Sequence, residues 1–212
     1  QRAGEVDLEH FRHGDVVRAA AHGDRDVHTP RAEGQHADAA AGGGVAVRPD
    51  EGLAGCAETL QMPIRQVSQA DYLEARAAID AAKERFSPEH PMRGADLVAI
   101  FEPMGVVGRW IEQNRSAMVN VPMHFFRIGA ASMITCPFEL FIEFSLRIKA
   151  RARSLQTIVV QMTDDYLDYL PTRTAIEGGS YSSAPASTTC GPESGEALVE
   201  HALAAIEKMW RA

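Results

Sequence analysis

The strongest constraint on the fold is a change of apolar spacing, from strand to helix and back to strand, between residues 117 and 162. AMVNVPMHFF (117–126) has strand alternation, and ASMITC (131–136) returns as a second strand after a turn at Gly129. PFELFIEFSLRIK (137–149) has helical spacing, and QTIVVQM (156–162) is a β-branched run typical of a buried strand. This order of elements indicates an α/β chain of the α+β type.

Two prolines mark positions of special backbone geometry in this stretch. Pro122 lies inside the first strand and predicts an edge position or a bulge, because proline donates no ladder hydrogen bond. Pro137 suits the first position of a helix. The apolar face of that helix is predicted to comprise Phe138, Phe141, Ile142, Ser145 and Ile148. Basic residues crowd its C-terminal end, where they suit the helix dipole: Arg147, Lys149, Arg151 and Arg153.

The sequence before this stretch predicts one strand and two helical regions. Thr59–Val67 is typical of a strand, and Ser68 begins a capping box with Asp71 at the start of a helix. Residues 95–115 are expected to be helical in two pieces, because Pro103 interrupts the pattern together with Gly105, giving a break near Glu102.

The sequence after it predicts two more helices. RTAIEGG forms a short helix that ends at its two glycines. A longer helix runs from about Glu193 to Arg211, and its buried side is predicted to comprise Val199, Leu203, Ile206 and Trp210. The fold expected overall is a mixed β-sheet of about four or five strands packed with α-helices, in a domain spanning residues 58–212.

Residues 1–57 have a different character. The first 55 contain one aromatic residue, no lysine and five of the eight histidines. Such a segment buries too little apolar surface to offset its ordering entropy, so it is expected to be poorly ordered. A metal site built on His10 and His13 is one alternative. The Arg/Ala/Gly/His/Asp bias also suits a GC-rich gene read out of frame, which would make this a non-native lead segment.

Composition excludes several classes of function. A net charge of −8 argues against binding to nucleic acid, which needs a basic surface. No run of 18 apolar residues is present, so no transmembrane segment is expected, and no signal peptide is recognised at the start. A cytoplasmic location is the default expectation. The three cysteines are too far apart in sequence for a metal motif and are expected to be buried or incidental thiols: Cys56, Cys136 and Cys190.

Several residues in the central stretch have ordinary structural interpretations. Glu139, in the first turn of the predicted helix, suits the helix dipole. Tyr166 and Tyr169 follow a predicted strand, where tyrosines usually pack with a solvated hydroxyl. The neighbouring Asp164 and Asp165 suit a turn. The sequence has no nucleophile elbow, HExxH motif, phosphate loop or GxGxxG.

The residues from about 58 to the C-terminus resemble the C-terminal part of the catalytic domain of neutral/alkaline, non-lysosomal ceramidases, in particular their ceramidase-like bacterial branch. The resemblance is carried, in order, by FRIGAA, PFELFIEFSLRIKAR, QTIVVQM, YLPTRTAIEGGSYSS and GPESGEALVEHALAAIEKMW. It implies hydrolysis of an amide, in ceramide or another amide-bearing lipid or small molecule, with a single zinc. By the same resemblance, Glu139 and Tyr169 match the glutamate and tyrosine zinc ligands, and Tyr181 matches a tyrosine that stabilises the oxyanion.

The chain departs from the ceramidase pattern in three respects. The family's two zinc histidines and its serine, which lie in its N-terminal half, have no counterpart here. Phe138 stands where the family usually has glycine before the glutamate, and no immunoglobulin-like domain follows. The chain is therefore expected to hold half of a zinc site and to be inactive by itself. The resemblance also leaves export of full-length relatives open. The alternative is a non-catalytic α/β domain for partner binding or oligomerisation, with the helix Phe138–Ile148 as interface; a homo-oligomer is left open.

Overall fold

The computed structural model describes residues 52–85 and 94–211, which belong to one compact unit, Val47–Ala212. The expectations for residues 1–51, including the histidine metal site, lie outside the described residues. Within them the fold is mixed α/β, as the sequence predicts. No helix in the described part of the chain is long and apolar enough to cross a membrane.

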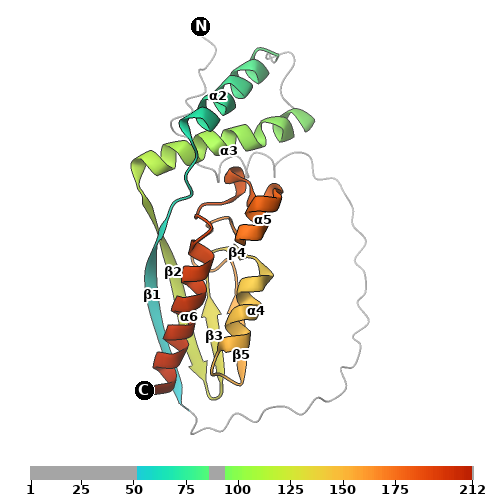
Figure 1. Ribbon diagram of the computed structural model, residues 1–212. Coiled ribbons are helices and arrows are strands. Elements are labelled where there is room, and N and C mark those ends of the chain that lie inside the picture. The colour runs from blue at the N-terminus through green and yellow to red at the C-terminus, as the bar shows by residue number, and fades with distance from the viewer. Residues whose placement is uncertain (1–51, 86–93, 212) are drawn as a thin grey trace, which may run out of the picture. The chain divides into compact units, whose positions relative to one another are not determined.

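A four-stranded sheet forms the centre of this unit, with strand order β1-β2-β3-β5 (Figure 1). Its strands are β1 (Leu53–Pro63), β2 (Met118–Ile128), β3 (Ala131–Thr135) and β5 (Gln156–Val160). The first three are antiparallel, and β5 runs parallel to β3. The crossover between these parallel strands contains helix α4 (Ile142–Arg151), which lies beside α6 (Ser194–Arg211) over one face of the sheet.

The first strand begins earlier and ends earlier than the sequence predicts. β1 starts at Leu53, so residues 53–57 belong to the sheet, although the sequence assigns them to the lead segment. All eleven residues of β1 pair with β2, from Leu53 opposite Ile128 to Pro63 opposite Met118. The long partner strand explains the difference, because it supplies hydrogen bonds to residues with little apolar pattern of their own.

Pro122 takes an edge-like position without a bulge. It lies opposite Thr59 of β1, whereas β3 pairs with β2 only from Phe125 to Ile128. The backbone N–H of His124 points to the β3 side, where it donates to Thr135 Oγ1 at 2.9 Å. Because N–H directions alternate along a strand, the nitrogen of Pro122 points to that same side, where no described strand pairs.

The predicted break in the second helical region is absent. α3 (Ala95–Arg115) is one helix with Pro103 inside it, and it packs against α2 (Gln69–Lys83). Proline in a helix interior costs about 3 kcal/mol, which here is offset by buried residues on both sides of it, such as Ile100 and Val107. The predicted capping box of α2 is confirmed, with Ser68 and Asp71 bonded to each other in both directions.

The core lies between the sheet and the two covering helices. Its largest fully buried side chains include Phe125 on β2, Phe144 on α4 and Ile206 on α6. Exposed ion pairs join the outer surfaces of the helices, among them Arg147 to Glu196 at 2.6 Å. The three cysteines are free, and burial raises the pKa of Cys136 to about 11 and of Cys190 to about 12. Both thiols are therefore protonated at neutral pH and unsuited to nucleophilic roles.

Two predictions about apolar faces need correction. α4 buries Phe144, Ser145 and Ile148, whereas Ile142 is 60% exposed, because the helix starts later than predicted. β5 is an edge strand with Ile158 exposed, since only β3 pairs with it among the described strands. On α6, Val199 and Ile206 are buried as predicted, while Leu203 and Trp210 are half-buried.

The remaining elements are short. They are β4 (Glu139–Leu140), β6 (Tyr169–Leu170), α5 (Arg173–Gly178) and the 3-10 turns η2 (Tyr181–Ser183) and η3 (Pro185–Ser187). As the sequence predicts, α5 ends at its two glycines: Gly178 is its last residue, and Gly179 caps it with a positive φ of 67°.

Candidate functional site

The residues after Pro137 form a short strand, not the first turn of a helix. Glu139 N donates to Asp168 O at 3.0 Å, and Phe141 N donates to Leu170 O at 3.2 Å. These two bonds belong to the parallel pairing of β4 with β6. The helix-dipole interpretation of Glu139 is therefore wrong, because α4 starts only at Ile142.

Strand alternation decides which way Glu139 points. Phe138 and Leu140, on either side of it, are buried in the core. Because successive side chains of a strand face opposite sides, the carboxylate of Glu139 faces away from the core. Tyr169 is its direct partner across β4 and β6, so the two side chains project from neighbouring strands on the same side.

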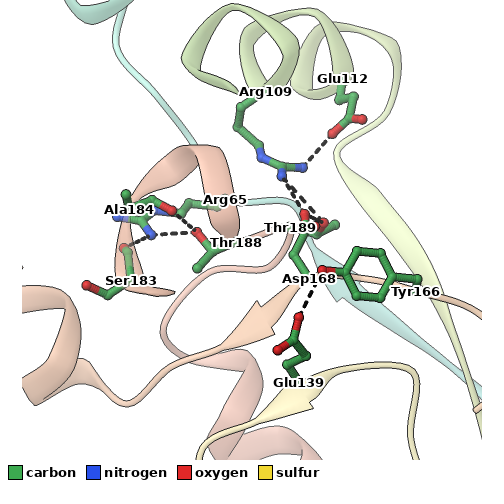
Figure 2. A network of polar contacts seen from close by, with 10 residues as sticks. All are labelled: Arg65, Arg109, Glu112, Glu139, Tyr166, Asp168, Ser183, Ala184, Thr188 and Thr189. Carbon is green, nitrogen blue, oxygen red and sulfur yellow. Dashed lines mark hydrogen bonds and ion pairs between the residues drawn. The ribbon is translucent and has the colours of Figure 1, made fainter. Parts of the chain in front are cut away.

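Two tyrosine phenols meet the Glu139 carboxylate. Tyr166 Oη donates to Glu139 Oε1 at 2.9 Å (Figure 2). Burial is the main cause that raises the pKa of Tyr166 well above its ordinary value, and this hydrogen bond is the second. A hydrogen bond to Glu139, followed by burial, raises the pKa of Tyr169 to about 12. Both phenols are therefore protonated at neutral pH.

Tyr181 completes an aromatic cluster around this carboxylate. Its ring lies edge-on to that of Tyr169, with centroids 6.0 Å apart, and 5.7 Å from the ring of Phe101 on α3. The residue is 59% exposed. The structure thus brings Glu139, Tyr169 and Tyr181 together, while their roles in zinc binding and catalysis remain predictions.

The raised pKa of Tyr169 predicts a pH effect that depends on Glu139. Folding favours the protonated phenol, so this contribution to stability is complete below pH 10, the ordinary pKa, and is lost as pH rises through about 12. We expect Glu139→Gln to lower the pKa of Tyr169 toward its ordinary value, because the opposing negative charge is removed. The measurement is the ultraviolet absorbance of tyrosinate during an alkaline titration.

The matched control for this titration is Glu143→Gln. It removes an exposed carboxylate from the first turn of α4, four residues from Glu139, and should leave the tyrosine titration unchanged. Equal titration curves for the wild-type chain and Glu139→Gln would contradict the assigned contact.

The donor set at this site fits part of a zinc shell. Carboxylate and phenol oxygens bind zinc, but a complete shell has four ligands. No group of three histidine, cysteine, aspartate or glutamate side chains that could hold a metal occurs among residues 52–85 and 94–211. The two described histidines contact other carboxylates instead. His124 Nδ1 lies 2.7 Å from Asp164 Oδ2, and His201 Nε2 lies 2.8 Å from Glu58 Oε2.

Three residues at the site were not singled out for it by the sequence: Tyr166, Arg109 and Asp168. The contact of Tyr166 depends on the bend of the chain between two short strands, which leaves no periodic signal. Arg109 is buried on α3 and contacts Asp168, the residue before Tyr169 (Figure 2). The sequence offered one signal for Arg109: it is a charged residue four positions after Gly105, on the inner side of the helix.

Two solved structures are similar to part of this chain. A ceramidase complexed with C2 is 22% identical over 43% of this chain and 15% of its own, with a TM-score of 0.37. The neutral ceramidase from Pseudomonas aeruginosa is 23% identical over 42% of this chain and 16% of its own, with a TM-score of 0.36. The chain thus spans less than a fifth of either ceramidase. No family model and no curated protein sequence matches it.

Proposed function

We propose that this chain supplies the glutamate–tyrosine part of a single-zinc amidase site of the neutral/alkaline ceramidase type. The observation that carries the proposal is the direct pairing of Glu139 with Tyr169 across β4 and β6, which projects both side chains from the same side of neighbouring strands. This pairing supports a shared role for two oxygen donors of the implied ligand set. The ordered motifs around both residues support the same assignment.

Each residue has a separate role in the proposed site. The carboxylate of Glu139 and the phenol oxygen of Tyr169 would hold the metal. A bound zinc supplies a water of lowered pKa as the nucleophile for amide hydrolysis. The hydroxyl of Tyr181, an exposed residue, would donate a hydrogen bond to the oxygen of the substrate amide as negative charge develops on it. Tyr166, which bonds to Glu139 Oε1, orients the carboxylate.

The proposed substrates are amide-bearing lipids or related small molecules. Tyr166 and Tyr181, whose side chains are largely aromatic ring, are 46% and 59% exposed, respectively. Such surface suits an acyl chain next to the reacting amide. The remaining ligands would come from polypeptide outside the stretch that resembles the ceramidases.

Zinc binding tests the proposal directly. We expect zinc titration of the 212-residue chain to show weak binding that Glu139→Gln weakens by about tenfold or more, because even indirect partners of a metal contribute this much. Isothermal titration calorimetry gives both affinities. Glu143→Gln again serves as the matched control. Equal zinc affinity for the wild-type chain and Glu139→Gln would contradict the proposal.

An amidase assay with ceramide and added zinc tests the incompleteness of the site. We expect no turnover above the zinc-containing buffer, because two protein ligands do not fix a catalytic zinc. Turnover that Glu139→Ala abolishes would show that the chain is a complete enzyme and would contradict the half-site assignment.

A further inference from the structure

The register of β4 and β6 needs an anchor outside the two strands. Each strand has only two residues, Glu139–Leu140 and Tyr169–Leu170. So short a pair has too few hydrogen bonds to fix its own register. A slip by one residue would turn Glu139 toward the core and Phe138 toward solvent. The position of the carboxylate therefore depends on contacts made by the flanking residues.

Asp168 links β6 to its surroundings through both its main chain and its side chain. Its carbonyl oxygen accepts the N–H of Glu139, and its backbone forms a bridge with Thr188. Its side-chain Oδ2 accepts a hydrogen bond from Thr189 Oγ1 at 2.9 Å. The backbone of Asp168 is left-handed, with φ 59°, a conformation that few non-glycine residues adopt. This bend immediately precedes Tyr169.

Arg109 holds the same carboxylate from α3. Its Nη2 lies 3.4 Å from Asp168 Oδ2 and from Thr189 Oγ1, and its Nη1 is 2.5 Å from Glu112 Oε2 (Figure 2). The guanidinium is 4% exposed, and Asp168 is 5% exposed. Arg109 has a second carboxylate partner in Glu112, and its guanidinium also stabilises the buried Asp168 carboxylate by its opposite charge. The guanidinium therefore ties Asp168 to α3.

We propose that Arg109 and Asp168 form a positioning pair, which holds the bend before Tyr169 and so sets Glu139 opposite that tyrosine. The pair acts through the backbone of Asp168, whose carbonyl oxygen accepts the N–H of Glu139. This inference rests on the proposed function only where it treats Glu139 and Tyr169 as metal ligands. The alignment of the two strands is tested without metal.

Hydrogen exchange of the Glu139 amide in the full chain reports this alignment. Asp168→Gly permits the left-handed bend but removes the carboxylate, so we expect the Glu139 amide to exchange at least about tenfold faster. Asp168→Asn also tolerates the bend and keeps an oxygen acceptor for Thr189, so its Glu139 amide should exchange within about threefold of the wild-type rate. The amide of Ala202, in the middle of α6, should be unaffected in both.

A second variant distinguishes the loss of strand alignment from unfolding of the whole domain. Arg109→Met alone would remove the guanidinium that lies 3.4 Å from the buried Asp168 carboxylate, which is itself destabilising. The double variant Arg109→Met/Asp168→Asn removes both charges, and we expect faster Glu139 exchange with an unchanged Ala202 rate. Arg147→Met is the matched control, because it removes an exposed arginine that pairs with Glu196 on α6. It should leave Glu139 exchange unchanged.

The outcomes separate the positioning pair from the proposed zinc site. Unchanged Glu139 exchange in Asp168→Gly and in the double variant would overturn the positioning pair, as would equal acceleration at Glu139 and Ala202. If both variants lose Glu139 protection and also weaken zinc binding, the pair serves the metal site. If the wild-type chain binds no zinc through Glu139, the proposed function fails, while the exchange rates still decide whether the pair aligns the strands.

Discussion

Gly105→Ala is expected to lower the free energy of unfolding by about 3 kcal/mol, at the upper end of the usual cost of overpacking. A Cβ at this position of α3 would lie 2.2 Å from Ala186 Cβ and 2.3 Å from Ala186 Cα in η3. One of these atoms belongs to the backbone, so relief requires that the helix and the turn move apart. Chemical denaturation followed by circular dichroism measures the loss.

Gly108→Ala is the matched control on the same helix. A Cβ there would have no heavy atom within 4 Å, and φ is not in the left-handed region. Alanine is the better helix former, so we expect a gain in stability of about 0.5–1 kcal/mol. Equal effects of the two substitutions would show that α3 does not pack on η3 as described.

The Gly105 variant should also disturb the candidate site. Arg109 lies one turn further along α3, so any retreat of the helix from η3 withdraws the guanidinium from Asp168. We therefore expect the Glu139 amide to exchange faster in Gly105→Ala and to keep its wild-type rate in Gly108→Ala.

The second large effect is expected at Gly195, in the first turn of α6. A Cβ there would lie 2.1 Å from Cζ of Phe144, a fully buried residue of α4. Because the ring fills the core and has no free space to move into, we expect Gly195→Ala to cost about 2–3 kcal/mol. The measurement is again the free energy of unfolding.

Replacing the Phe144 ring by a smaller side chain tests whether the contact with this ring causes the loss of stability in Gly195→Ala. Phe144→Leu alone should cost about 1 kcal/mol, whereas Gly195→Ala/Phe144→Leu should be more stable than the sum of the single effects predicts. Additive losses would mean that the two residues do not touch. A positive coupling would confirm that α4 and α6 approach each other through this pair.

Much of the fold is predictable because it depends on spacing within single elements. The capping box at Ser68 and the turn at Gly129 are confirmed, since each depends on neighbours a few residues away. The same holds for the strand-helix-strand order of the central stretch. Strand and helix boundaries were less accurate, because partners distant in sequence extend β1 to Leu53 and keep α3 continuous through Pro103.

The candidate site is the clearest case of what the sequence leaves open. The sequence by itself determined that Glu139, Tyr169 and Tyr181 occur in motifs resembling those of ceramidases, and that a mixed sheet with helices surrounds them. Only the tertiary structure decided that Glu139 lies in a strand, because Phe138 and Leu140 fill the core and backbone bonds to β6 replace the first helical turn. The contact between Arg109 and Asp168 was likewise decided by tertiary structure, since 59 residues separate them and no periodic pattern links a helix face to a bend in a distant loop.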